Sequence, residues 1–145
     1  MKLYVILFAI AVIVMYSLYY RKNPLISKVR VGSHTFTVDV AVTALEKMQG
    51  LSGKDSLPPN HGRLFVYDHQ EQYEFWMKGM KFPLDFIWIA DHTVVNITEN
   101  VPAPTGLMPA IVKPYVDVDK ILEVTAGTIT KSGIKVGDTV QFIDR

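Results

Sequence analysis

The strongest constraint on the fold is a seven-residue stretch over residues 84–90, in which every residue except Asp85 is apolar. The run is short for a helix and lacks the alternation of a half-buried strand, so it predicts a strand covered on both faces. A carboxylate in such a strand needs a hydrogen-bonding partner. Residues 73–78, which include Trp76, alternate in character and predict a preceding strand, with a turn over residues 79–83 between the two.

Alternation of apolar and polar residues recurs along the chain after residue 34 and defines the rest of the expected sheet. Further strands are predicted over residues 35–41, 63–68, 93–99, 120–125 and 139–143. We expect residues 69–72 to turn the strand over 63–68 into a hairpin with residues 73–78. Because tight turns join most strands, the pattern favours a mainly β fold with minor α: a small, rolled or barrel-like, mostly antiparallel sheet of about seven strands.

One or two short helices complete the expected domain. Thr43 and Glu46 stand three residues apart, as in a capping box, and predict a helix over residues 43–49. A helical turn or two is expected within residues 126–133. The segments 51–62 and 100–114 are rich in proline and glycine, so we expect both to be surface loops.

The N-terminal segment has a different character, because residues 3–20 carry no charged side chain and precede Arg21 and Lys22. As a helix, this segment is about 27 Å long, just enough to cross a bilayer. The sequence therefore predicts a transmembrane anchor over residues 1–22, a stem over 23–34 and a β-rich domain over 35–145.

Two other interpretations of the N-terminal segment remain open. A cleaved signal peptide would need small residues in A-x-A spacing, and a buried helix would need a complementary apolar pattern after it. The basic residues after the segment favour a cytoplasmic domain, whereas the short Met-Lys start is typical of an uncleaved export signal. We expect a single-pass membrane protein that contacts lipid through residues 3–20 and has an extracytoplasmic domain.

Composition excludes several kinds of site. The chain has no cysteine, so disulfides, thiolate metal ligands and a cysteine nucleophile are impossible. Residues 31–145 carry ten Lys and Arg against fourteen Asp and Glu, a net charge of −4. A mildly acidic domain is a poor nucleic-acid binder, and we expect no nucleic-acid partner.

The candidate site consists of Trp76, Lys78, Asp85 and Glu123. Glu123 interrupts an apolar strand as Asp85 does. Two carboxylates in an apolar setting can act as an acid and a base, because burial pushes their pKa values apart. The structural alternative is that Lys78 pairs with one of them and fixes the turn. A tryptophan beside charged groups is also typical of a site that holds a sugar or a peptide.

Other chemistry finds little support in the sequence. The four histidines, His34, His61, His69 and His92, show no metal-ligand spacing, and we interpret them as solvated turn residues rather than ligands. No serine has the context of a nucleophile elbow, and no glycine-rich segment has the spacing of a phosphate-binding loop. We therefore expect neither a metal nor a cofactor.

Several segments together resemble the DUF192 family of uncharacterised proteins. The segments GRLFVYD, FWMKGMKFPLDFIWI, ILEVTAG and GIKVGDTV match family segments in order, over residues 38–142. The resemblance implies a small β-rich domain and no particular activity. The chain departs from the family pattern at Gly79 and Met80, where the family has Asn-Thr, and at Arg63, where the family usually has Met.

These observations lead to three hypotheses for function. The first is a membrane-anchored binding or accessory domain at the cell envelope, whose four candidate residues hold a small polar ligand or a peptide. The second is a hydrolase of a cell-envelope polymer, with Asp85 and Glu123 as its acid and base. The third is a structural interaction module that contacts a partner through the loop over residues 100–114.

Overall fold

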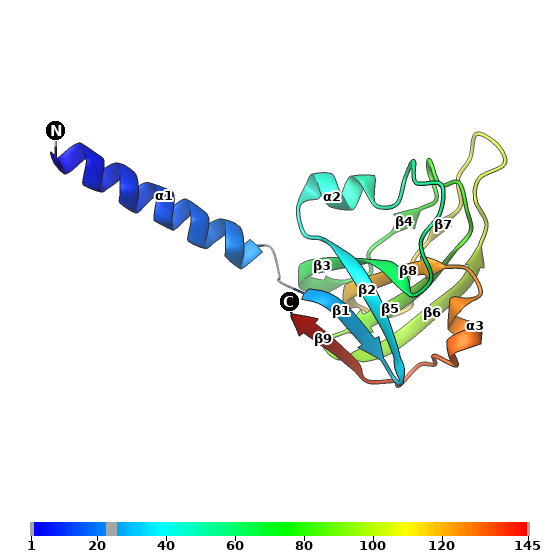
Figure 1. The fold of residues 1–145 in the computed structure, drawn as a ribbon. Helices are drawn as coiled ribbons and strands as arrows, with labels where there is room; N and C mark the ends of the chain where they lie inside the picture. The colour runs from blue at the N-terminus through cyan, green and yellow to red at the C-terminus, as the bar shows by residue number, and fades with distance from the viewer. Residues whose placement is uncertain (1, 23–25, 145) are drawn as a thin grey trace.

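A computed structural model describes residues 2–22 and 26–144, and places the side chains of the first helix for residues 4–15 (Figure 1). The elements follow the order α1 (Lys2–Lys22), β1 (Ile26–Val31), β2 (His34–Ala41), α2 (Ala44–Gln49), β3 (His61–Glu71), β4 (Phe75–Trp76), β5 (Leu84–Ala90), β6 (Thr93–Val101), β7 (Ile111–Val112), β8 (Val118–Thr125), α3 (Thr128–Ser132) and β9 (Val140–Asp144).

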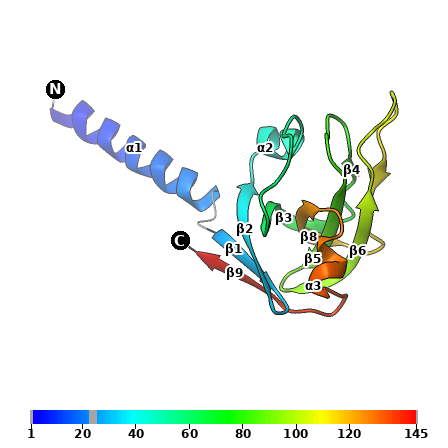
Figure 2. The ribbon, with the colours of Figure 1, turned by 45° about the vertical axis from the view of Figure 1, so that its right-hand side comes forward.

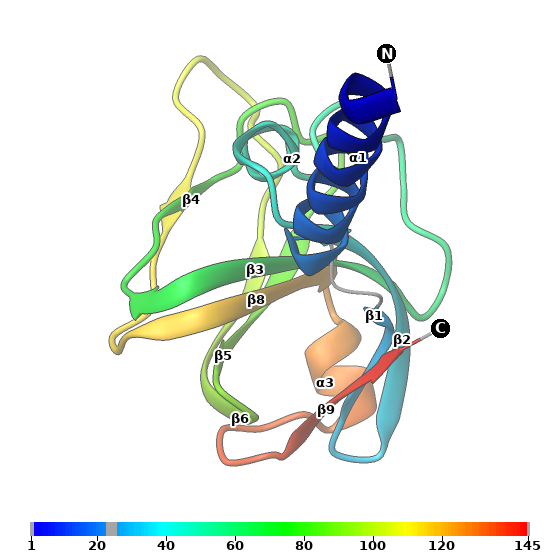
Figure 3. The same cartoon turned by 90° about the vertical axis from the view of Figure 1, so that its left-hand side faces the viewer.

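Seven strands form one sheet in the order β6-β5-β8-β3-β2-β1-β9, and β4 and β7 form a separate pair. Within the main sheet the strands pair antiparallel, except that β2 and β3 are parallel. The two edge strands meet at one end, where Thr93 bridges Thr139 and the N–H of Val94 donates to the Asp138 carbonyl over 3.0 Å. The sheet is therefore curled (Figure 3), which confirms the expected mainly β, rolled and mostly antiparallel fold.

The central strands bury apolar side chains on both faces, as the sequence of β5 predicts. Ile87 and Ile89 face the inside of the curl, in an inner core that includes residues of β1, β2, β8 and β9. Phe86 and Trp88 face the other way, into an outer core covered by residues around β4 such as Met77. The two sides of β5 therefore belong to different environments.

The short helix α2 begins as predicted. The Thr43 hydroxyl accepts from the N–H of Glu46 over 3.3 Å, and the Glu46 carboxylate accepts from the N–H of Thr43 over 2.9 Å. This reciprocal pair satisfies two backbone donors at the start of the helix. The helix lies at the same end of the domain as β4 and β7 (Figures 1 and 2).

The prediction of a hairpin between residues 63–68 and 73–78 is wrong, because these two segments do not pair with each other. Strand β4 is only two residues long and pairs with β7, which lies within the segment expected to be an irregular loop. Pro109 and Pro114 lie on either side of β7 and limit it, but they leave room for a two-residue pairing between them. The N–H of Met77 extends this contact by donating to the Ala110 carbonyl over 2.9 Å.

The predictions for the N-terminal part also need correction. Among the residues that the structure describes, none lies in a helix that is both long and apolar enough to cross a membrane. The expected transmembrane anchor and the single-pass localisation are therefore wrong. Much of the expected stem is also sheet, because β1 occupies residues 26–31, while residues 23–25 lie outside the described part.

Candidate functional site

The four residues predicted to form a site are divided between the two faces of the sheet. Asp85 is paired across strands with Val124, and Phe86 with Glu123. Directly opposite residues project to the same face, and consecutive residues in a strand project to opposite faces. Asp85 therefore lies on the inner-core face with Val124, and Glu123 lies on the outer-core face with Phe86. The structure does not bring the two carboxylates together as an acid and base pair.

Asp85 is fully buried and holds two separate segments of backbone. Its Oδ1 accepts from the N–H of Asn100 over 2.8 Å, and its Oδ2 accepts from the N–H of Ile129 over 3.0 Å. Each oxygen thus has a backbone donor, at the end of β6 and in the first turn of α3. The contacts with Lys78 that the sequence suggested are replaced by these backbone contacts, and Asp85 is a structural residue.

Trp76 lies on the surface at the end of β4. Its side chain is 52% exposed, although the flanking Phe75 and Met77 are buried in the outer core. The ammonium of Lys78 lies 5.0 Å from the centroid of the Trp76 ring, within the range of a cation–π contact. Two of the predicted site residues therefore do lie together, on the exposed side of β4.

The turn after Lys78 is tied to the loop that follows α2. The N–H of Gly53 donates to the Gly79 carbonyl over 3.0 Å, and the Ser52 hydroxyl donates to the Lys78 carbonyl over 2.5 Å. Gly79 has a φ of +73°, in the left-handed region that glycine and, less readily, asparagine adopt. The family's Asn at this position is therefore compatible with the same turn.

Glu123 lies at a small cavity between this turn and helix α2. The cavity has a volume of ≈ 20 Å³, about enough for one water molecule or one hydroxyl group. Its wall brings together the end of α2, the loop after it and the exposed tryptophan. The lining residues are Lys47, Met48, Gln49, Gly50, Leu51, Ser52, Phe65, Phe75, Trp76, Met80 and Glu123.

The hydrogen bonding of the Glu123 carboxyl group is incomplete among the described residues. The residue is 5% exposed, and its Oε2 has no hydrogen-bond partner among the described residues. Arg63 is its neighbour across the strands, but the guanidinium Nη2 donates to the Glu46 carbonyl over 3.3 Å. The Nε of Arg63 also has no partner in the described part of the chain. Such orphaned atoms are rare in native domains, where an ordered water, an ion or a functional role usually accounts for them.

Burial raises the pKa of Glu123 to about 8, although the Arg63 guanidinium acts in the opposite direction. The ordinary pKa of a glutamate is 4.5, so the carboxyl group is chiefly protonated at neutral pH. A protonated carboxyl group can both donate and accept a hydrogen bond. Glu123 is therefore suited to hold a neutral polar group.

A shallow hollow lies on the outer side of Trp76. It has a volume of ≈ 210 Å³ and is lined by Glu74, Phe75, Trp76 and Ile111. Trp76 and Phe75 also line the Glu123 cavity. The cavity and the hollow are separate pockets that share these two residues, and we refer to the pair as the Trp76–Glu123 cleft.

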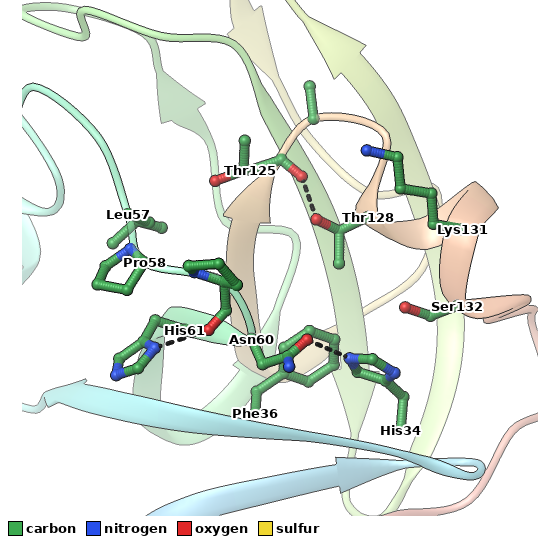
Figure 4. A pocket seen from close by; sticks show the side chains of 12 residues that line it. His34, Phe36, Leu57, Pro58, Asn60, His61, Thr125, Thr128, Lys131 and Ser132 are labelled. Atoms are coloured by element: carbon green, nitrogen blue, oxygen red, sulfur yellow. Dashed lines mark hydrogen bonds between the residues drawn. The ribbon is translucent and has the colours of Figure 1, made fainter.

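A second, larger cavity has no counterpart in the sequence predictions (Figure 4). Its volume is ≈ 360 Å³, and it is lined by His34, Phe36, Leu57, Pro58, Pro59, Asn60, His61, Thr125, Ala126, Thr128, Lys131 and Ser132. Two histidines interpreted as solvated turn residues lie in its wall. No sequence pattern predicts this cavity, because its lining residues come from three separate segments that only the folded chain brings together.

Comparison with known proteins gives one family and two solved structures. A crystal structure from Sinorhizobium meliloti 1021, described as a "putative transcription regulator", is 34% identical, covers 79% of this chain and 92% of that chain, and has a TM-score of 0.72. A protein of unknown function from Novosphingobium aromaticivorans DSM 12444 is 29% identical, covers 81% of this chain and 85% of that chain, and has a TM-score of 0.73. A search of curated proteins finds no match. The DUF192 family model, described as an uncharacterized ACR, matches residues 27–142, and the chain therefore belongs to the DUF192 family.

Proposed function

We propose that the domain binds a small polar ligand, or one end of a peptide, in the Trp76–Glu123 cleft. The observation that carries the proposal is the buried Oε2 of Glu123, which has no partner among the described residues and lines a cavity beside an exposed tryptophan. An unsatisfied buried polar atom costs about 1–3 kcal/mol. A ligand group that donates a hydrogen bond to this oxygen would recover that free energy.

The two parts of the cleft define the chemistry of the ligand. The cavity at Glu123 has room for about one hydroxyl group. The half-exposed ring of Trp76 offers a flat surface on which a sugar ring or an apolar side chain can stack. The ligand is therefore a molecule with a neutral hydrogen-bonding group next to a flat or apolar face.

Ligand screening by thermal shift on the full chain tests this function. The library contains sugars, amino-acid amides and short peptides, and each hit is repeated with Glu123→Leu, Trp76→Ala and Asp85→Asn. We expect the first two variants to lose the shift. Asp85→Asn is the matched control, since it alters the buried carboxylate on the opposite face, and we expect it to retain the shift relative to its own baseline.

Tryptophan fluorescence gives an independent readout. The chain contains two tryptophans, and Trp88 is fully buried whereas Trp76 is exposed. A hit that binds in the cleft is expected to change the emission of Trp76 and to have no effect in Trp76→Ala. A hit that raises the melting temperature of all variants equally would show that the ligand does not bind in the cleft.

An interaction module that uses the loop over residues 100–114 is the second candidate. Leu107 is 100% exposed and Met108 is 90% exposed, so two large apolar side chains project from this loop. A partner that binds there would still be captured when Trp76, Lys78, Asp85 and Glu123 are replaced, and would be lost when the loop is shortened.

The description of the Sinorhizobium structure as a "putative transcription regulator" would suggest DNA binding, but the charge of this chain does not favour it. Recognition of a nucleic acid depends on basic surface that neutralises phosphates. Residues 31–145 instead have a net charge of −4. Absence of binding to duplex DNA at low salt is therefore the expected result.

A further inference from the structure

We propose that the ≈ 360 Å³ cavity is a second binding site, which takes a small organic anion with an apolar body. It shares no lining residue with the Glu123 cavity. The volume falls within the range of about 300–1,000 Å³ typical of small-molecule sites. The proposal is independent of the function proposed for the Trp76–Glu123 cleft.

Hydrogen bonds fix the walls of this cavity. The Oδ1 of Asn60 accepts from the Nε2 of His34 over 2.9 Å, and the Asn60 carbonyl accepts from the N–H of Thr37 over 2.9 Å. These two bonds hold the segment over residues 57–61 against β2. On the opposite wall, the Thr128 hydroxyl donates to the Thr125 carbonyl over 2.5 Å. The cavity is thus built into the fold (Figure 4).

The polar lining is basic or neutral throughout. Lys131, His34 and His61 line the cavity together with the hydroxyls of Thr128 and Ser132, and none of its twelve lining residues is Asp or Glu. This composition contrasts with the net charge of −4 over residues 31–145. A concave site lined by one kind of charge concentrates ligands of the opposite charge.

Lys131 is available to an anion. Four other lysines of the domain have a carboxylate within 4 Å, namely Lys54, Lys81, Lys113 and Lys120. The ammonium of Lys131 makes no such ion pair with any residue that the structure describes. Two carboxylates that contact α3 have other partners, because Glu99 accepts from the Thr130 hydroxyl and Asp85 accepts from the N–H of Ile129. An anionic ligand would supply the partner that Lys131 lacks.

The rest of the lining is apolar and indicates the body of the ligand. Phe36 is fully buried, and Leu57, Pro58, Pro59 and Ala126 complete the apolar part of the wall. Inorganic phosphate alone would leave this surface uncovered. A carboxylate attached to a ring or a short alkyl chain matches both the basic and the apolar parts.

Titration of the full chain with benzoate, followed by amide NMR, tests the proposal. Benzamide serves as the neutral molecule of the same shape, and inorganic phosphate as the anion without an apolar body. We expect benzoate to shift the amides of residues 60–61 and 125–132 in a saturable manner. Benzamide and phosphate are expected to bind at least about ten-fold more weakly.

Lys131→Gln is expected to weaken benzoate binding about five-fold, because it removes the ammonium that pairs with the carboxylate. Lys135→Gln is the matched control, since it makes the same charge change at an exposed lysine outside the cavity. Equal binding of benzoate and benzamide would overturn the proposal. So would benzoate affinity that is unchanged in Lys131→Gln or equally reduced in Lys135→Gln, or shifts confined to residues around Trp76.

Discussion

Asp85 and Glu123 are two buried carboxylates on neighbouring strands, yet their surroundings differ in one decisive respect. Both oxygens of Asp85 accept backbone N–H groups, at 2.8 and 3.0 Å. One oxygen of Glu123 has no partner among the described residues, and burial raises the pKa of this residue to about 8. The comparison teaches that burial alone does not identify a functional acid. What distinguishes the two is whether the fold itself satisfies the carboxyl group.

The largest effect in this comparison is expected for Asp85→Ala. The substitution leaves the N–H groups of Asn100 and Ile129 without their acceptor in a buried place. We expect it to lower the free energy of unfolding by about 3–5 kcal/mol, as measured by urea denaturation. A loss below about 1 kcal/mol would show that Asp85 does not hold α3 and the end of β6 in place.

Glu123→Gln is expected to have the opposite sign. A pKa raised from 4.5 to about 8 means that the folded state keeps a proton which the unfolded state loses between these pH values. The stability that native Glu123 contributes is therefore fully present below about pH 4.5 and is lost as the pH rises toward 8. Glutamine cannot ionise, so Glu123→Gln should be on the order of 3 kcal/mol more stable than the native chain at pH 8.

The pH dependence of Glu123→Gln supplies its own control. Urea denaturation at pH 4.5 is expected to give nearly equal free energies of unfolding for the variant and the native chain. A variant that is destabilised at pH 8, as Asp85→Ala is expected to be, would place Glu123 in the same structural class as Asp85.

Arg63→Met sharpens the comparison by removing the positive charge next to Glu123. The guanidinium lowers the pKa of Glu123 against the effect of burial, so its loss should move that pKa further above 8. The loss of stability with rising pH is then expected to extend to higher pH, as measured by urea denaturation across the alkaline range. Arg30→Met, an exposed change elsewhere in the sheet, should leave this profile unaltered.

The smallest effect on stability is expected for Trp76→Ala. The ring is half exposed, so its loss should cost less than about 1 kcal/mol. Trp88→Ala is the matched control, because Trp88 is fully buried and its Nε1 donates to the Thr98 hydroxyl over 2.9 Å. We expect that control to cost about 3–5 kcal/mol in thermal denaturation. A comparable loss in Trp76→Ala would make Trp76 a core residue rather than part of a cleft.

Local patterns predicted much of the fold. The apolar run over residues 84–90 is a strand covered on both faces, and the capping box at Thr43 begins a helix. Strand β7 was not predictable, because two residues between prolines carry no periodic signal. Its pairing with β4 depends on contacts between segments that are distant in the sequence.

The sequence predicted only part of the candidate site, because Trp76 and Glu123 line the cleft whereas Asp85 lies on the opposite face. Asp85 and Glu123 both stand out as single carboxylates in apolar strands, but the face of each depends on the register between β5 and β8. A shift of one residue in that register would exchange the faces. The cavity at Lys131 was not predictable for a related reason, since His34, Asn60 and Lys131 belong to segments that only the folded chain brings together.

Direct titration of the Glu123 carboxyl group by carbon-13 NMR on the full chain tests the central claim, with Glu123→Gln used to assign the signal. We expect the carboxyl signal of the ligand-free protein to titrate with a midpoint of about 8. A midpoint at or below the ordinary value of 4.5 would show a carboxylate already stabilised by the fold, and would contradict the proposal that Glu123 awaits a ligand.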